Sequence, residues 1–174
     1  MSKLGQELGS DIPFFFDAPT ALVRGWGDQI MPLQLQDYRW FVLVNPGFPI
    51  YTETAYQRLD KSRNSTPPLT KNFLQVEEAE CITWEGILSC MVNDFEEILF
   101  VDFPVLAHIK ARLLETGAEA ALLSGTGATV FGVFLDQRIA ERARELLAMV
   151  SGWQVYVVSS QQIRLFERRI SVNS

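Results

Sequence analysis

The chain has 174 residues, of which 48% are hydrophobic and 21% are charged, a balance typical of a globular protein rather than a disordered one. Its formal net charge of −6 gives it no overall attraction to a phosphate backbone, so we expect no nucleic-acid partner. Cys81 and Cys90 form no C-x-x-C pair and His108 is the one histidine, so no metal site is predicted. No apolar run is long enough for a membrane span and no signal-peptide pattern begins the chain, which predicts a cytoplasmic protein without a membrane partner.

The predicted elements of the first third are short and are separated by turn residues. Pro46-Gly47 ends a continuous apolar run of the kind found in a strand at the centre of a sheet. Thr52 is a suitable N-cap for the helix that follows. The expected elements are a helix end at residues 1–10, an apolar run at 12–16, strands at 21–24 and 38–45, and a helix at 52–59.

Helical spacing of apolar residues dominates the middle of the chain. The polar stretch 60–70, with Pro67-Pro68, is predicted to be a surface loop, and residues 93–96 break or re-cap a helix. The expected helices are 77–91, 103–115 and 139–150, and the expected strands are 120–123, 128–134 and 153–158. On the helix at 103–115, the residues expected to face inward are Leu106, Ile109, Leu113 and Leu114.

The order of these elements predicts an α+β fold. From residue 38 onward a strand, helices, two strands joined by a tight loop, a helix and a last strand follow one another. That order is the split βαβ plan of a ferredoxin-like sandwich. Residues 1–36 do not fit the plan and are interpreted as part of another domain. We therefore expect two domains, 1–36 and 37–174.

Asp11 lies between a helix terminator and an apolar run, in the segment Leu8-Gly-Ser-Asp-Ile-Pro13. A carboxylate held at such a point can accept a proton from an alcohol, as a general base does. The alternative is a plain turn that Asp11 caps. The segment Arg24-Gly-Trp-Gly-Asp28 is also prominent, and its structural alternative is a bulged strand with a turn.

A glycine-rich loop joins two predicted strands. Glycines let the backbone approach a phosphate, and successive N–H groups can surround it. The alternative is a hairpin loop that needs glycine for positive φ angles. No Lys-Ser/Thr pair follows, so the loop is not of the Walker A type. The residues of the loop are Ser124, Gly125, Thr126, Gly127 and Ala128.

Thr52 and Tyr56 are four residues apart, so a helix places them on one face. An exposed tyrosine near a helix N-terminus can stack on a base while the helix end faces a phosphate. The alternative is that Tyr56 packs in the core.

The residues of these segments and their order along the chain resemble one family closely, over nearly the whole chain. The family is that of the 4-diphosphocytidyl-2-C-methyl-D-erythritol kinases, in the GHMP kinase superfamily. The segments that carry the resemblance are Leu8-Gly-Ser-Asp-Ile-Pro-Phe-Phe-Phe16, Arg24-Gly-Trp-Gly-Asp28, Asn45-Pro-Gly47 with Thr52 and Tyr56, and Leu123-Ser-Gly-Thr-Gly-Ala-Thr-Val-Phe131.

The resemblance implies an enzyme that uses ATP and Mg²⁺ to phosphorylate a hydroxyl of a cytidine-diphosphate-linked methylerythritol, in the non-mevalonate route to isoprenoids. It implies that Asp11 is the catalytic aspartate, that Tyr56 stacks on the cytosine and that Thr52 lies near the diphosphate. It further implies that the loop Ser124–Ala128 closes against the phosphate site. Residues 1–36 would be a remnant of a ribosomal-S5-like N-terminal domain, and 37–174 the C-terminal domain.

One feature of the family does not occur in these 174 residues, namely a phosphate loop of the form P-x-x-x-G-L-G-G-G-S-S. We therefore expect the chain to be a fragment, the product of a misassigned gene start or the product of a decayed gene, to bind ATP and its metal poorly, and to be inactive as a kinase by itself. We also expect self-association through strand edges or the phenylalanines at 14–16.

Three other interpretations remain at this point. The chain could belong to a GHMP kinase for another alcohol, such as homoserine or mevalonate. It could be a non-enzymatic ferredoxin-like binding module, or it could have no function of its own.

Overall fold

The computed structural model describes residues 20–24, 29–32, 35, 37–62 and 83–160. These fall into two compact units, one that holds the first two strands and one that spans Leu33–Ser159. Asp11 and the phenylalanines at 14–16 lie outside the described residues, and the predicted boundary at residue 36 stays a prediction. No helix in the described ranges has the length and hydropathy that a bilayer span requires.

The first unit contains a β-hairpin. Strand β1, Ala21–Arg24, pairs antiparallel with β2, Gln29–Pro32, so that Ala21 lies opposite Pro32 and Arg24 opposite Gln29. The strand predicted at 21–24 is confirmed at both ends. Strand β2 was not predicted.

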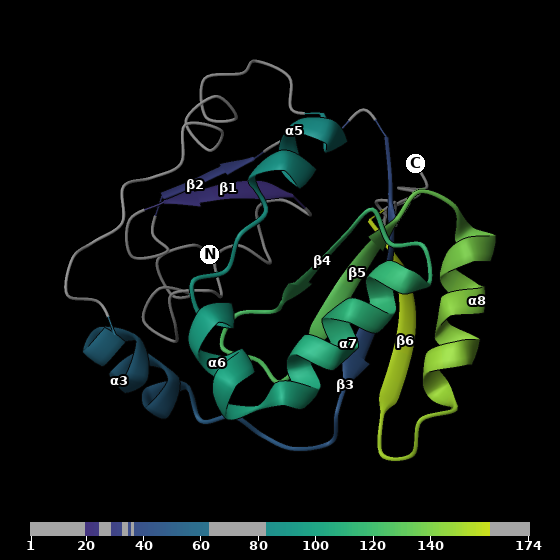
Figure 1. The fold of residues 1–174 in the computed structure, drawn as a ribbon. Helices are drawn as coiled ribbons and strands as arrows, with labels where there is room; N and C mark the ends of the chain where they lie inside the picture. Colours follow the sequence, from purple (N-terminus) through teal and green to yellow (C-terminus); the bar gives the residue numbers. More distant parts are fainter. Residues whose placement is uncertain (1–19, 25–28, 33–34, 36, 63–82, 161–174) are drawn as a thin grey trace, which may run out of the picture. The chain divides into compact units, whose positions relative to one another are not determined.

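The second unit is built on a four-stranded antiparallel sheet with the order β4-β5-β3-β6 (Figure 1). The long apolar strand predicted before Pro46 is β3, and it lies between β5 and β6, as its composition indicated. This strand order and the helical connections confirm the predicted ferredoxin-like sandwich. The four strands are Trp40–Asn45 (β3), Ala120–Leu123 (β4), Val130–Phe134 (β5) and Gln154–Ser159 (β6).

Five helices of this unit are described. The helix α3 starts at Thr52, which is its first residue rather than the predicted N-cap, and it runs to Ser62, three residues into the predicted loop at 60–70. Pro104 begins α7 in the first-turn position where a missing N–H costs nothing. Asp136 caps α8, accepting hydrogen bonds from the N–H groups of Arg138 and Ile139. The bounds are Thr52–Ser62 (α3), Trp84–Cys90 (α5), Glu96–Asp102 (α6), Pro104–Glu115 (α7) and Gln137–Ala148 (α8).

Two further predictions about the helices are wrong. The helix expected over 77–91 does not run through Thr83, which has extended backbone angles and caps α5 with its side chain. The apolar spacing of residues 77–91 extends across Thr83. The hydroxyl of Thr83 accepts a hydrogen bond from the N–H of Gly86, which begins the helix there. Leu114 was expected to face inward but is 44% exposed, because it lies about 100° around the helix from its buried neighbour Leu113.

The core lies between one face of the sheet and the helices α7 and α8, of which α7 contacts β4 and β5 while α8 contacts β3 and β6. Alternate residues of β3 supply Val42 and Val44 to this face. Gly132 permits close packing, since a Cβ there would lie 3.1 Å from a methyl of Leu113. The helices supply Leu106, Ile109, Leu113, Ala140, Ala143 and Leu147, all with 0% exposure.

The other face of the sheet is covered in part by α5. Trp84 packs on Phe41 with ring centroids 5.9 Å apart, and Phe41 packs on Phe131 at the same separation. The indole Nε1 of Trp84 donates to the carbonyl oxygen of Asp37 at 2.9 Å. These contacts fix α5, and with it the turn that follows α5, relative to the sheet.

Candidate functional site

The glycine-rich loop connects β4 to β5 and is closed by its own backbone. The N–H of Ser124 donates to the carbonyl of Thr129 at 2.9 Å, and that of Gly127 donates to the carbonyl of Ser124 at 2.9 Å. Gly125 and Gly127 have φ angles of 55° and 83°, in the region that favours glycine. Within the part of the chain that the structure describes, the N–H groups of Gly125 and Thr126 have no acceptor.

The N-terminus of α3 meets this loop. The hydroxyl oxygens of Thr52 and Thr126 are 3.3 Å apart, although the two residues are 74 positions apart in the sequence. The first N–H groups of a helix have no partner inside the helix and carry a partial positive charge. Two hydroxyls, a helix end and a loop with two N–H groups that have no acceptor among the described residues thus lie together, which suits an oxyanion such as a phosphate.

Tyr56 lies one turn further along α3, on the same exposed face as Thr52. Its side chain is 53% exposed, so the alternative that it packs in the core is wrong. The buried face of α3 is formed instead by Ala55 and Leu59, at 1% and 7% exposure. The ring of Tyr56 lies edge-on to Phe95, with centroids 5.0 Å apart and an angle of 84°. This contact leaves the ring supported on one side while half of its surface stays in solvent.

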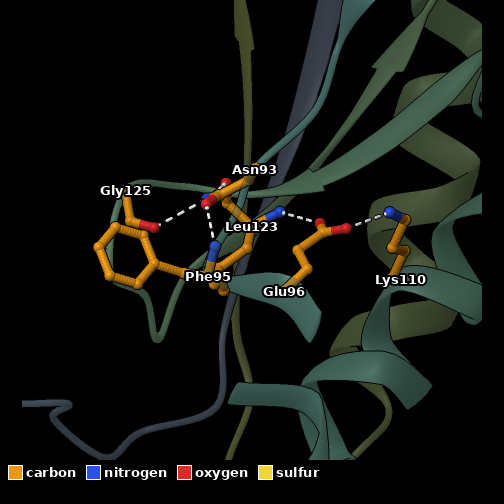
Figure 2. Close-up of polar contacts among 6 residues, drawn as sticks. All are labelled: Asn93, Phe95, Glu96, Lys110, Leu123 and Gly125. Carbon is orange, nitrogen blue, oxygen red and sulfur yellow. Dashed lines mark hydrogen bonds and ion pairs between the residues drawn. The ribbon is translucent and has the colours of Figure 1, made fainter. Parts of the chain in front are cut away.

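The turn between α5 and α6 holds the base of the loop (Figure 2). Asn93 Nδ2 donates to the carbonyl oxygens of Leu123 and Gly125, both at 2.8 Å. One carboxylate oxygen of Glu96 accepts from the N–H of Leu123 at 2.8 Å, and the other forms an ion pair with Lys110. The backbone on both sides of Ser124 is therefore fixed by side chains.

Asn45 holds the other end of the loop. Its Nδ2 donates to the hydroxyl of Thr129 at 3.0 Å, and its Oδ1 accepts from the N–H of Gly47 at 2.8 Å. The end of β3, the Pro-Gly turn and the loop are tied together by this one side chain. An ion pair between Arg58 and Asp102, 2.8 Å apart, further joins α3 to α6.

A cleft of about 560 Å³ lies at the opposite end of the strands. Two of its lining side chains already have structural roles, because Asp136 caps α8 and Arg39 pairs with Glu119 at 2.8 Å. We place the candidate site at the glycine loop, where the hydroxyls of Thr52 and Thr126 meet. The cleft is lined by residues 37–40 and 135–138.

The family resemblance assigned Thr52, Tyr56 and the loop to one site. In the structure Thr52 contacts the loop, and Tyr56 lies one turn away on the same face of α3. The structure does not describe Asp11, whose role stays a prediction. Asn93, Glu96 and Asn45 were not identified as site residues. Residues 93–96 were noted only as a helix break, and no short motif reveals that their partners lie about 30 residues away.

No three His, Cys, Asp or Glu side chains group closely enough to hold a metal ion within the described ranges. The carboxylate of Glu96, which contacts the strand end before the loop, is engaged by Lys110 and the N–H of Leu123. We therefore assign no metal-binding role to the described residues.

Comparison with known proteins gives a consistent result. Residues 75–148 match the family model described as GHMP kinases C terminal. The chain is 38% identical over 154 residues to the 4-diphosphocytidyl-2-C-methyl-D-erythritol kinase of Pelobacter propionicus, covering 88% of this chain and 52% of that protein. It is 37% identical over 172 residues to the protein of the same name from Solibacter usitatus, covering 97% and 54%.

Solved structures agree with the sequence relatives. A crystal structure of a 4-(cytidine 5′-diphospho)-2C-methyl-D-erythritol kinase superposes with a TM-score of 0.66 at 27% identity, covering 89% of this chain and 55% of that one. A homoserine kinase from Cytophaga hutchinsonii gives 0.60 at 19% identity, covering 81% and 49%, and shows the shared fold alone. The chain spans about half the length of the curated relatives that it matches. The resemblance inferred from the sequence motifs is confirmed.

Proposed function

We propose that this chain, which carries the C-terminal domain of the GHMP kinases, supplies the acceptor-substrate side of a kinase. The kinase would phosphorylate a hydroxyl of 4-diphosphocytidyl-2-C-methyl-D-erythritol with ATP as donor, a step of non-mevalonate isoprenoid biosynthesis. The observation that carries the proposal is the meeting of the α3 N-terminus with the glycine loop, at the 3.3 Å contact of Thr52 and Thr126.

The layout of the site supports a substrate that joins a base to a diphosphate. Tyr56 lies four residues beyond Thr52, which is about 6 Å along the axis of a helix. A cytosine on the exposed face of Tyr56 would leave its diphosphate near Thr52 and the loop N–H groups. The acceptor hydroxyl would then extend from the diphosphate toward the donor.

In this proposal Asp11 is the general base. Its carboxylate accepts the proton of the acceptor hydroxyl as the hydroxyl oxygen attacks the γ-phosphorus of ATP. The bond from that phosphorus to the bridging oxygen breaks, and ADP leaves. Such a transfer depends mainly on positioning and on charge stabilisation, which the loop and the helix end supply on the acceptor side.

A hybrid enzyme tests the proposal. The matched segment of the Solibacter usitatus kinase, which corresponds to 97% of this chain, is replaced by this chain's residues. ADP release is then measured with ATP, Mg²⁺ and the cytidine substrate. We expect turnover by the hybrid and none by the 174-residue chain alone. A folded hybrid that phosphorylates homoserine or mevalonate, and not the cytidine substrate, would contradict the proposal.

Two substitutions in the hybrid test the proposed roles. Asp11→Asn is expected to lower kcat by about 10²–10⁴-fold, the range for loss of a general base. Tyr56→Ala is expected to raise the KM for the cytidine substrate roughly 5- to 150-fold, since base–aromatic stacking is worth about 1–3 kcal/mol. Tyr156→Ala is the matched control, because Tyr156 is similarly exposed, at 56%, but lies on β6. An equal rise in KM for both tyrosine variants would argue against stacking on Tyr56.

A further inference from the structure

The side chain of Asn93 uses both ends of its amide (Figure 2). The two hydrogens of Nδ2 go to the carbonyl oxygens of Leu123 and Gly125, at 2.8 Å each, and Oδ1 accepts from the N–H of Phe95 at 2.9 Å. An amide nitrogen has two donor hydrogens, and these two bonds use both of them. This pattern requires an amide, because a carboxylate would place an oxygen against two carbonyl oxygens.

The partners of Asn93 belong to two different parts of the site. Leu123 ends β4 and Gly125 lies in the glycine loop, so the Nδ2 bonds fix the start of the loop. Phe95, fixed through its backbone by the same amide, supports the ring of Tyr56 edge-on at 5.0 Å. One side chain therefore holds both the loop and the support of Tyr56.

We propose that Asn93 is a positioning residue that sets the distance and angle between the glycine loop and the ring of Tyr56. This inference rests on the proposed function, in which the loop faces the diphosphate and Tyr56 faces the base. Asn93 acts through these two groups and does not touch the substrate. Glu96, charge-balanced by Lys110, supports the same strand end through the N–H of Leu123.

The kinetic test uses Asn93→Ala and Asn93→Asp in the hybrid enzyme. Both are expected to lower kcat/KM for the cytidine substrate at least tenfold, with a raised KM for Asn93→Ala because both groups lose their fixed positions. Asn93→Asp keeps the acceptor for Phe95 but loses the donors to the loop, so its KM is expected to change less and its kcat to fall. Gln57→Ala is the control, since that exposed amide donates to Glu53 on the same helix, and less than a twofold change is expected.

A double-variant cycle separates positioning from a general loss of folded enzyme. If Asn93 supports Tyr56, then Tyr56→Ala raises KM by a smaller factor in the Asn93→Ala background than in the unchanged hybrid. Independent, multiplying effects on KM would overturn the inference. In Asn93→Ala, a mere reduction in folded enzyme would lower kcat and leave KM unchanged, and that result would also overturn the inference.

The full 174-residue chain gives a readout that does not depend on catalysis. Asn93→Ala is expected to shift the NMR signals of the Gly125 and Gly127 amides and of the Tyr56 ring together, whereas Gln57→Ala leaves the glycine signals in place. Movement of the loop signals alone would overturn the coupling. An inactive unchanged hybrid, combined with joint shifts in the chain, would refute the proposed function and leave the positioning role of Asn93 supported.

Discussion

Gly47 occupies a position where any side chain would meet two obstacles. Its φ angle is 86°, and a Cβ there would lie 2.9 Å from the carbonyl oxygen of Gly152. Gly152 has the same φ angle of 86°, but a Cβ there would meet nothing within 4 Å. The two glycines therefore separate the cost of the backbone conformation from the cost of the clash.

Alanine at these two positions should destabilise the protein by different amounts. We expect Gly152→Ala to cost roughly 1–2 kcal/mol, the penalty of a left-handed conformation. Gly47→Ala adds an overpacking cost of about 1–3 kcal/mol and is expected to cost roughly 2–5 kcal/mol in total. Urea unfolding of both variants measures the difference, and equal losses would show that the Gly152 carbonyl moves away at no cost.

Cys90 is half-buried at the end of α5, where its Sγ donates to the carbonyl of Ile87 at 3.2 Å. Burial raises the pKa of the Cys90 thiol, and its backbone hydrogen bond lowers that pKa by a smaller amount. Because the thiolate is the reactive form, we expect iodoacetamide to label Cys90 several times more slowly in the folded chain than in urea. A Cys81→Ser variant restricts the measurement to Cys90, and equal labelling rates would contradict the expected protection.

Strand β6 offers a test of sheet alternation at the scale of an element. Val157 lies half-buried against the core, whereas its neighbour Val158 is on the other face and is 45% exposed. We expect Val157→Asp to cost about 3 kcal/mol or more, since it buries an unpaired charge. Val158→Asp is expected to cost under about 1 kcal/mol, the span of strand propensity. Thermal unfolding measures both, and similar losses would mean that the two faces of β6 are equally covered.

Elements bounded by turn residues were predicted accurately from the sequence. Strand β4 was predicted at both of its ends, because Gly117 and the glycine loop flank it. The start of α5 was not, since apolar spacing cannot show that Thr83 prefers to bind a backbone N–H. Strand β5 begins at Val130, two residues later than predicted, because Ala128 and Thr129 belong to the loop.

The candidate site was predictable only where its residues lie in recognisable segments. Helix periodicity places Thr52 and Tyr56 on one face and the glycines indicate the loop, but it is the family resemblance that assigns them to one site. Asn93 could not be identified in this way, because its role comes from contacts with Leu123 and Gly125 that depend on tertiary folding. A single polar residue that positions a site through tertiary contacts forms no motif that one sequence can reveal.

At the scale of the whole molecule, the central strand of the sheet pairs with the last strand described. Trp40 lies opposite Ser159 and Asn45 opposite Gln154, so β3 gains a neighbour on that side from a segment more than 100 residues later in the chain. Its other neighbour, β5, is also distant in the sequence. Such non-local pairing slows folding, because the entropy of a long loop must be lost before the strand contacts can offset that loss.

This strand order has a consequence for synthesis on the ribosome. While the nascent chain grows at roughly 5–20 residues per second, β3 emerges before β5 and β6 and remains without its partners until they have left the exit tunnel. We expect stalled nascent chains to resist proteolysis only after Ser159 has emerged, and a chaperone that binds exposed strands to protect β3 until then. Resistance in chains stalled before Gln154 would show that the sheet is stable without its last strand.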